Sequence, residues 1–135
     1  MAAAFFTYSF EKLEVYQLAR KFRVEIKKLS LAFPVDERFE LTSQIRRSSS
    51  SVATNLAEGS GRASSNDQAH FSNVSYSSAL ETIDHLIYAL DMEYINEEIY
   101  KNLRVRLDEI INKLNALYKF QIGQNDHLKN KFRKG

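Results

Sequence analysis

Apolar side chains recur every three or four residues along the chain, which is the period of an amphipathic helix. The first run predicts a helix over residues 10–31, with Ser9 as its N-cap and Pro34 just beyond its end. This spacing is typical of a helix that buries one side in a bundle. Its apolar face carries Val15, Leu18, Phe22, Ile26 and Leu29.

A second helix is predicted to begin between Asp36 and Thr42, where acidic residues favour a helix start, and to end at Gly59. Gly59 and Gly61 are expected to supply the positive φ angles that end many helices. Small side chains flank its apolar stripe and should let a neighbouring helix approach closely. The stripe is Leu41, Ile45, Val52 and Leu56, and the small residues are Ser48, Ser49, Ala53 and Ala57.

Two more helices complete the pattern. Overlapping capping boxes in residues 64–68 start a third helix that should reach about Met92. Asn96 caps a fourth, which should reach about Gln121. The sequence therefore predicts an all-α fold, an antiparallel up-down-up-down four-helix bundle over residues 10–121. An apolar segment (residues 1–9) precedes the bundle, and a basic tail (residues 122–135) follows it.

The third helix is apolar over about two-thirds of its circumference, which is more than one buried face requires. Either its own bundle covers nearly every side, or the helix also packs against another subunit. A second stripe at helix–helix spacing favours another subunit, and an interface repeated by a closed rotation gives a ring. The candidate interface residues are Tyr76, Leu80, Ile83, Ile87 and Leu90.

The 135 residues are enough for one domain with a core and too few for two. The absence of cysteine excludes disulfides and thiolate chemistry. No stretch approaches the roughly 20 apolar residues of a membrane span, and the N-terminal residues lack the basic start of a signal peptide. We therefore expect a cytoplasmic protein without membrane association.

Charge is unevenly distributed, although the net charge is only +2. Lys and Arg outnumber Asp and Glu by six to three in residues 1–33 and by six to one in residues 110–135, but are outnumbered nine to three in residues 67–109. The asymmetry indicates an interaction surface or a basic tail, or else helices of opposite charge that lie side by side within the chain or across a subunit contact. The candidate nucleic-acid-binding residues are Arg20, Arg23, Lys27, Arg46, Arg47, Lys129, Lys131, Arg133 and Lys134.

Catalytic patterns are weak in this sequence. A two-metal bundle needs Glu-x-x-His pairs on two helices, whereas this chain has a single Glu81-x-x-x-His85. We find no nucleophile with an evident base and no glycine-rich loop before a helix. We therefore predict a non-catalytic protein that uses no metal or cofactor.

Polar residues around the end of the second helix have two interpretations. They either hydrogen-bond the turn and the neighbouring helices, or they form a functional seam that continues along the helix through Arg47, Ser51 and Thr54. The residues concerned are Asn55, Glu58, Gly59, Gly61 and Arg62, together with Glu81 of the third helix.

Several motifs carry a family resemblance. The most specific is Asn-Leu-Ala-Glu-Gly-Ser-Gly-Arg at residues 55–62, and the others extend from Phe10 to about Leu117. These are Phe10-Glu11-x-Leu13-x-Val15-Tyr16, Phe33-Pro34-x-x-Glu37, Leu41-Thr42-x-Gln44-Ile45-Arg46-Arg47, Phe71, Ser78-Ala79-Leu80-Glu81 and Tyr94-Ile95. In these motifs the chain resembles the four-helix bundle proteins encoded by intervening sequences of bacterial 23S ribosomal RNA genes. Ser48–Ser50 stand where alanines are more usual in that family, and Glu93 stands where glycine is common.

The resemblance implies a left-handed bundle that assembles as a homopentamer, and it implies no activity. A more distant likeness, of architecture alone, connects the chain to the accessory variability protein of diversity-generating retroelements. We expect a homo-oligomeric scaffold or adaptor associated with RNA or ribonucleoprotein. The alternatives are a protein-only interaction module, whose charge asymmetry serves assembly, and an accessory subunit of a reverse-transcriptase system.

Overall fold

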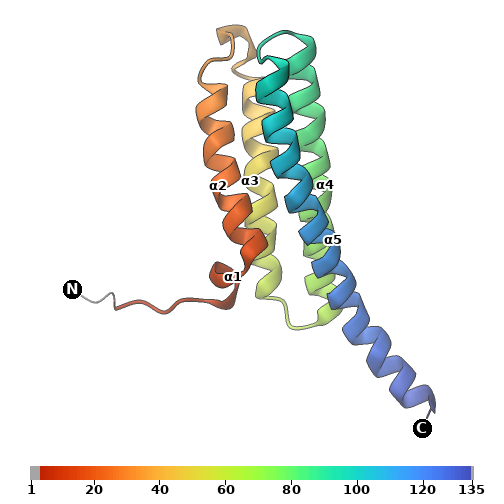
Figure 1. Ribbon diagram of the computed structural model, residues 1–135. Helices are drawn as coiled ribbons and strands as arrows, with labels where there is room; N and C mark the ends of the chain where they lie inside the picture. The colour runs from red at the N-terminus through yellow and green to blue at the C-terminus, as the bar shows by residue number, and fades with distance from the viewer. Residues whose placement is uncertain (1–3, 135) are drawn as a thin grey trace.

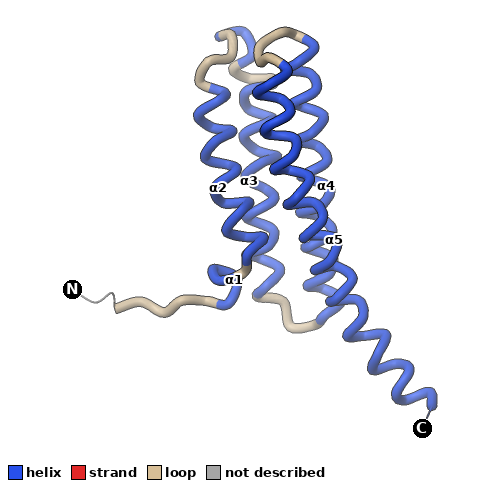
Figure 2. Tube along the Cα trace, in the orientation of Figure 1, coloured by secondary structure: helices blue, strands red, loops and turns tan. Residues whose placement is uncertain are grey.

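The computed structural model describes residues 4–134, with side chains for residues 4–123, and this part contains helices and no strand (Figure 2). Four long helices lie side by side, as the sequence predicted (Figure 1). Two of the links between them lie at one end of the molecule, and the α3–α4 link lies at the other end with α1. The elements are α1 (Ser9–Lys12), α2 (Glu14–Ser30), the 3₁₀ turn η1 (Val35–Glu37), α3 (Leu41–Ser60), α4 (Ser65–Asp91) and α5 (Glu97–Lys134).

The predicted apolar stripes form one continuous core. Leu18, Leu29 and Leu117 are half-buried at its margins. Within the described residues, no helix is both long and apolar enough to cross a membrane. Residues at the centre of the core include Val15, Phe22 and Ile26 of α2, Leu41, Ile45, Val52 and Leu56 of α3, and Leu103, Leu107, Ile110 and Leu114 of α5.

The first predicted helix is divided into two. Leu13 has an extended conformation, with φ −69° and ψ 124°, and separates α1 from α2. The side-chain amide of Gln17 donates to the Glu11 carbonyl oxygen across this break, at 3.1 Å. Ser9 is the first helical residue and not the N-cap, a position that Tyr8 occupies. Local spacing missed the break because Leu13 still packs against the core.

The last helix is longer than predicted. We expected it to end near Gln121, where the apolar stripe is lost, but α5 continues to Lys134 and projects beyond the other helices (Figure 1). The loss of a stripe marks where α5 leaves its neighbours and does not mark where the helix ends.

The contact between α3 and α4 is built from small and hydroxyl side chains. Ser75 Oγ donates to the Val52 carbonyl oxygen at 2.9 Å, and Thr82 Oγ1 donates to Ser48 Oγ at 2.8 Å. The predicted small residues of α3 are buried or half-buried here. The buried polar residues of α4 were not predicted, because polar side chains give no apolar signal in the sequence. These are Ser72, Ser75, Thr82 and His85.

The second stripe of α4 is used partly within the chain. Tyr76, Ile83 and Leu90 are half-buried and pack against the core. Leu80 and Ile87 remain 45% and 39% exposed. The wide apolar arc of α4 therefore serves the chain's own bundle over part of its width, since α3 and α5 both pack on this helix.

Gly59 and Gly61 do not adopt the conformation predicted for them. No glycine in the described residues has a positive φ, and Gly61 has φ −87° and ψ −1°. Gly59 is instead required for space, because a Cβ built there would lie 2.7 Å from the Cβ of Phe71 on α4. The close approach of the two helices, and not a left-handed turn, explains this glycine.

The α4–α5 turn has its left-handed residue at Glu93, with φ 62°. The Glu93 amide donates to the Leu90 carbonyl oxygen, and the Tyr94 amide donates to the Ala89 carbonyl oxygen, both at 2.9 Å. This is a Schellman motif, in which the left-handed position favours glycine. The chain therefore adopts here a conformation that strains a side chain other than glycine.

We predict that Gly59→Ala destabilises the protein by about 1–3 kcal/mol, because the new methyl group overlaps Phe71. Gly61→Ala is the matched control, since its Cβ would meet the Glu58 carbonyl oxygen at an ordinary 3.5 Å. Urea denaturation at equal protein concentrations measures both changes. A Gly59→Ala variant as stable as the unmodified chain would contradict the steric explanation.

We predict that Glu93→Gly stabilises the protein by about 1 kcal/mol by relieving the left-handed strain. Glu93→Val should destabilise it, because a β-branched residue is disfavoured at positive φ. Thermal unfolding should therefore order the three midpoints as Gly above Glu above Val. Equal midpoints for Gly and Val would show that the turn can adopt another conformation at little cost.

Candidate nucleic-acid interface

Basic side chains of α2 and α3 border a groove on the outer face of the bundle. Arg23, Lys27 and Lys28 come from α2, Arg46 comes from α3, and the groove has a volume of about 390 Å³. Val24 lies among them and is 48% exposed. The helical period brings the α2 residues to one side, and the packing of α3 on α2 adds Arg46.

Arg46 is held in place by the end of α2. Its Nε donates to Ser30 Oγ at 2.6 Å, and Ser30 Oγ donates to the Lys27 carbonyl oxygen at 2.8 Å. In the part of the chain whose side chains are described, Arg23, Lys27, Lys28 and Arg46 form no ion pair with a carboxylate. Four cations without internal counter-charges create a positive potential that suits a phosphate group.

The other predicted basic residues lie elsewhere or cannot be placed. Arg20 is exposed on α2, one turn before Arg23. Arg47 is separated from the groove, because its Nη2 lies 3.8 Å from Glu81 Oε2 on α4. The side chains of the predicted tail residues Lys129, Lys131, Arg133 and Lys134 lie outside the described residues. The structure thus gathers Arg23, Lys27 and Arg46, and it adds Lys28.

The polar residues at the end of α3 make local contacts. Arg62 Nη2 lies 2.9 Å from Glu58 Oε1, and its guanidinium stands 4.5 Å from the centre of the Phe71 ring. Asn55 Nδ2 donates to the Ser51 carbonyl oxygen at 2.9 Å. These contacts stabilise the end of α3 and its link to α4.

Glu81 lies between two basic groups. Its Oε2 contacts His85 Nε2 at 3.1 Å, in addition to Arg47. His85 is 8% exposed and lies against α3. Within the described residues, no group of three or more His, Asp or Glu is placed to hold a metal ion.

An acidic pocket of about 380 Å³ lies where α3 begins beside α4, and Glu37, Glu40 and Asp84 contribute to its lining. Glu37 is only 5% exposed and accepts a hydrogen bond from the Tyr94 hydroxyl at 2.8 Å. This hydrogen bond is the main cause that raises the pKa of Tyr94 to about 12. The charge of Glu37 also raises the pKa of Tyr88. The pocket therefore favours positive charge.

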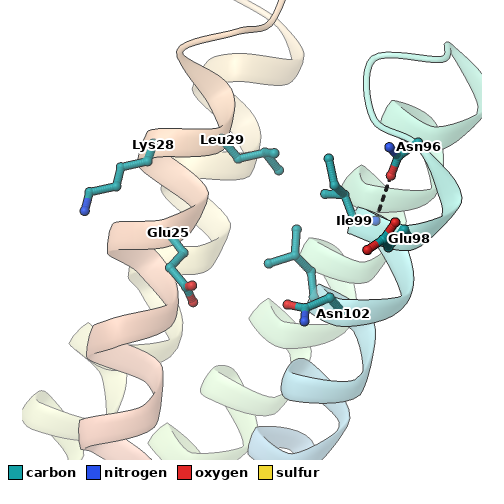
Figure 3. A pocket seen from close by; sticks show the side chains of 8 residues that line it. Glu25, Lys28, Leu29, Asn96, Glu98, Ile99 and Asn102 are labelled. Atoms are coloured by element: carbon teal, nitrogen blue, oxygen red, sulfur yellow. Dashed lines mark hydrogen bonds between the residues drawn. The ribbon is translucent and has the colours of Figure 1, made fainter.

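A wider groove of about 670 Å³ separates α2 from α5 (Figure 3). Leu29 and Ile99 face it from the two helices, and Glu25, Asn96 and Asn102 lie around it. An ion pair between Glu25 and Arg106 joins the helices beside this groove. Its mixture of aliphatic and polar groups suits the packing of a side chain and presents no nucleophile beside a base.

Comparisons with known proteins agree with this helical architecture. The chain is similar to the crystal structure of a protein with unknown function from the S23 ribosomal protein family of Bacteroides thetaiotaomicron, with 29% identity and a TM-score of 0.71. The match covers 78% of this chain and 98% of that one. No curated protein matches the chain. A family model described as 23S rRNA-intervening sequence protein matches residues 11–116. The chain therefore belongs to the 23S rRNA-intervening sequence protein family.

Proposed function

We propose that this protein is a non-catalytic, homo-oligomeric scaffold that binds the phosphate backbone of RNA through the groove between α2 and α3. The observation that carries this proposal is the group of four basic side chains without carboxylate partners among the described side chains. Phosphate contacts supply most of the sequence-independent affinity for nucleic acid, and they need several cations on one surface.

The type of contact follows from the side chains present. The groove offers guanidinium and ammonium groups around an aliphatic valine, and no aromatic ring lines it. Base stacking on aromatic rings is the usual basis of sequence-specific recognition of single-stranded RNA. Binding should therefore follow the backbone and depend little on sequence. The similar structure's name refers to a ribosomal protein family, which supports RNA as the partner class.

The scaffold that we propose is a ring of antiparallel, up-down-up-down, left-handed bundles, with five copies as the resemblance implies. The positions of the links in Figure 1 support the alternating helix order. Leu80 and Ile87 support an interface, because both are large and partly exposed on one side of α4. A ring would repeat the basic groove once per subunit and so multiply its phosphate contacts.

The acidic pocket favours a second candidate function, a protein-only interaction module. Its carboxylates could receive a basic side chain from another protein or from the groove of a second copy. In that case the charge asymmetry would serve assembly and not RNA binding. Salt would weaken assembly in this alternative, whereas it weakens RNA binding in the first.

We predict that Arg23→Gln, Lys27→Gln and Arg46→Gln together weaken RNA binding and lower the slope of log affinity against log salt by about two units. Each lost phosphate contact to a single strand removes about 0.7 from that slope. Fluorescence anisotropy with two unrelated RNA oligonucleotides at several salt concentrations gives the slope.

The matched control changes Lys21, Lys101 and Lys119 to Gln, which removes the same net charge outside the groove at positions that also lack an ion pair among the described side chains. Circular dichroism should show unchanged helicity in both variants. Equal loss of binding by the two variants would point to net charge alone. An RNA affinity of the unmodified protein that stays the same at all salt concentrations would contradict binding through phosphate groups.

We predict that light scattering finds the unmodified protein at a multiple of its 15.6 kDa chain mass, with five copies expected. Leu80→Glu with Ile87→Glu should dissociate it into folded monomers, because like charges would meet in the interface. Asn112→Glu with Asn115→Glu places the same charges at exposed polar positions of α5, outside the α4 stripe, and should leave the oligomer intact. A monomeric unmodified protein would refute the scaffold.

A further inference from the structure

The segment before α1 carries an unusual amount of exposed aromatic surface. Phe5, Phe6 and Tyr8 are 74%, 73% and 61% exposed, and the chain leads away from the bundle here (Figure 1). The Phe6 and Tyr8 rings meet edge to face, with their centres 5.1 Å apart. We call residues 4–8 the N-terminal arm. Its own bundle leaves these three rings largely uncovered.

The direction of the arm is fixed where it joins α1. The backbone amide of Tyr8 donates to Glu11 Oε2 at 2.8 Å, and Tyr8 itself is extended, with φ −77° and ψ 157°. These contacts hold the last residue of the arm against the first turn of the helix. The arm therefore leaves the bundle along a defined path.

A cavity of about 220 Å³ lies at the same end of the bundle. Its lining is mixed. Four apolar side chains (Phe10, Leu13, Leu56 and Leu117) can pack against the faces of an aromatic ring. Polar side chains complete the border, and these are Ser9, Ser60, Gln68, Ser72 and Gln121. The volume is sufficient for one aromatic side chain.

We propose that the N-terminal arm of one copy packs on the neighbouring copy of this chain and inserts an aromatic ring, Phe6, into this cavity. The inference rests on the homo-oligomer proposed above and names the segment that joins its subunits. Each cavity is then completed by a residue of the adjacent copy. Because arm and cavity lie at the same end of the bundle, a ring of parallel bundles brings them together.

The reach and area of the arm agree with this assignment. Phe6 lies two extended residues, or about 7 Å of backbone, beyond the anchored Tyr8, and its side chain adds to this reach, whereas adjacent helices lie about 8–10 Å apart. The arm can therefore cross onto a bundle packed alongside. Its three rings expose roughly 400 Å² in total, which is about half of one partner's share of a standard protein interface. So much apolar surface in four residues is comparable to the largest patch on a typical monomer.

A cross-link tests where the arm docks. The chain contains no cysteine, so Thr7→Cys with Ser60→Cys introduces a single defined pair and leaves all three aromatic rings of the arm in place. A short bismaleimide should join the arm of one copy to the cavity of the next and give a ladder of covalent oligomers on a denaturing gel. Thr7→Cys with Asn102→Cys, in which Asn102 is exposed on α5 near the end of the bundle opposite to α1, is the matched control and should give little ladder.

A second variant tests what the rings contribute. Phe5→Ser, Phe6→Ser and Tyr8→Ser together leave the helix core and the backbone cap unchanged, so circular dichroism should be unaltered. The subunit dissociation constant from light scattering across a dilution series should rise at least tenfold. If the unmodified protein is an oligomer and this variant has the same subunit dissociation constant, the arm inference is wrong and the scaffold proposal still holds.

The remaining outcomes are also decisive. A cross-link found only within single chains would show that the arm folds back on its own bundle, which overturns the inference. An unmodified protein that is monomeric at all concentrations would overturn both the arm inference and the proposed scaffold.

Discussion

The distance between α3 and α4 is the constraint on which the rest of the bundle depends. At Gly59 the two helices approach so closely that even a methyl group would overlap Phe71. Ala53 and Ala79 are completely buried, and a hydroxyl group of α4 donates a hydrogen bond to a hydroxyl group of α3 across the contact. Larger side chains, such as Phe22 of α2 and Leu107 of α5, then fill the space on the remaining side. The short distance between α3 and α4 is thus fixed, and α2 and α5 pack around this pair.

This asymmetry determines where the molecule offers binding surfaces. Small residues close the α3–α4 contact, whereas α2 and α5 are joined partly by the ion pairs Glu25–Arg106 and Glu14–Lys113 and leave a groove (Figure 3). The cations that border the basic groove lie on α2 and α3, and the carboxylates of the acidic pocket lie where α3 begins beside α4. The basic groove and the acidic pocket therefore lie on different parts of the bundle. This small protein thus has two surfaces that favour binding partners of opposite charge.

The sequence predicted the helices and their buried stripes because long apolar repeats dominate local structure. It misassigned Gly59, because helix-ending glycines and close-contact glycines look alike until the neighbouring helix is placed. It placed Arg47 with Arg46 in the candidate nucleic-acid-binding surface. Adjacent residues on a helix point about 100° apart, and Arg47 contacts α4 instead. It missed the buried hydroxyls of α4, which become apparent only when two helices are packed together.

The hydroxyl-rich contact between α3 and α4 also affects how stability responds to temperature. Exposure of apolar surface raises the heat capacity on unfolding, and exposure of polar surface lowers it. A bundle held partly by Ser75, Thr82 and Ser48 should therefore have a smaller heat-capacity change than a leucine-rich bundle of equal length. Its free energy of unfolding would follow a flatter curve and vary less between cold and warm conditions.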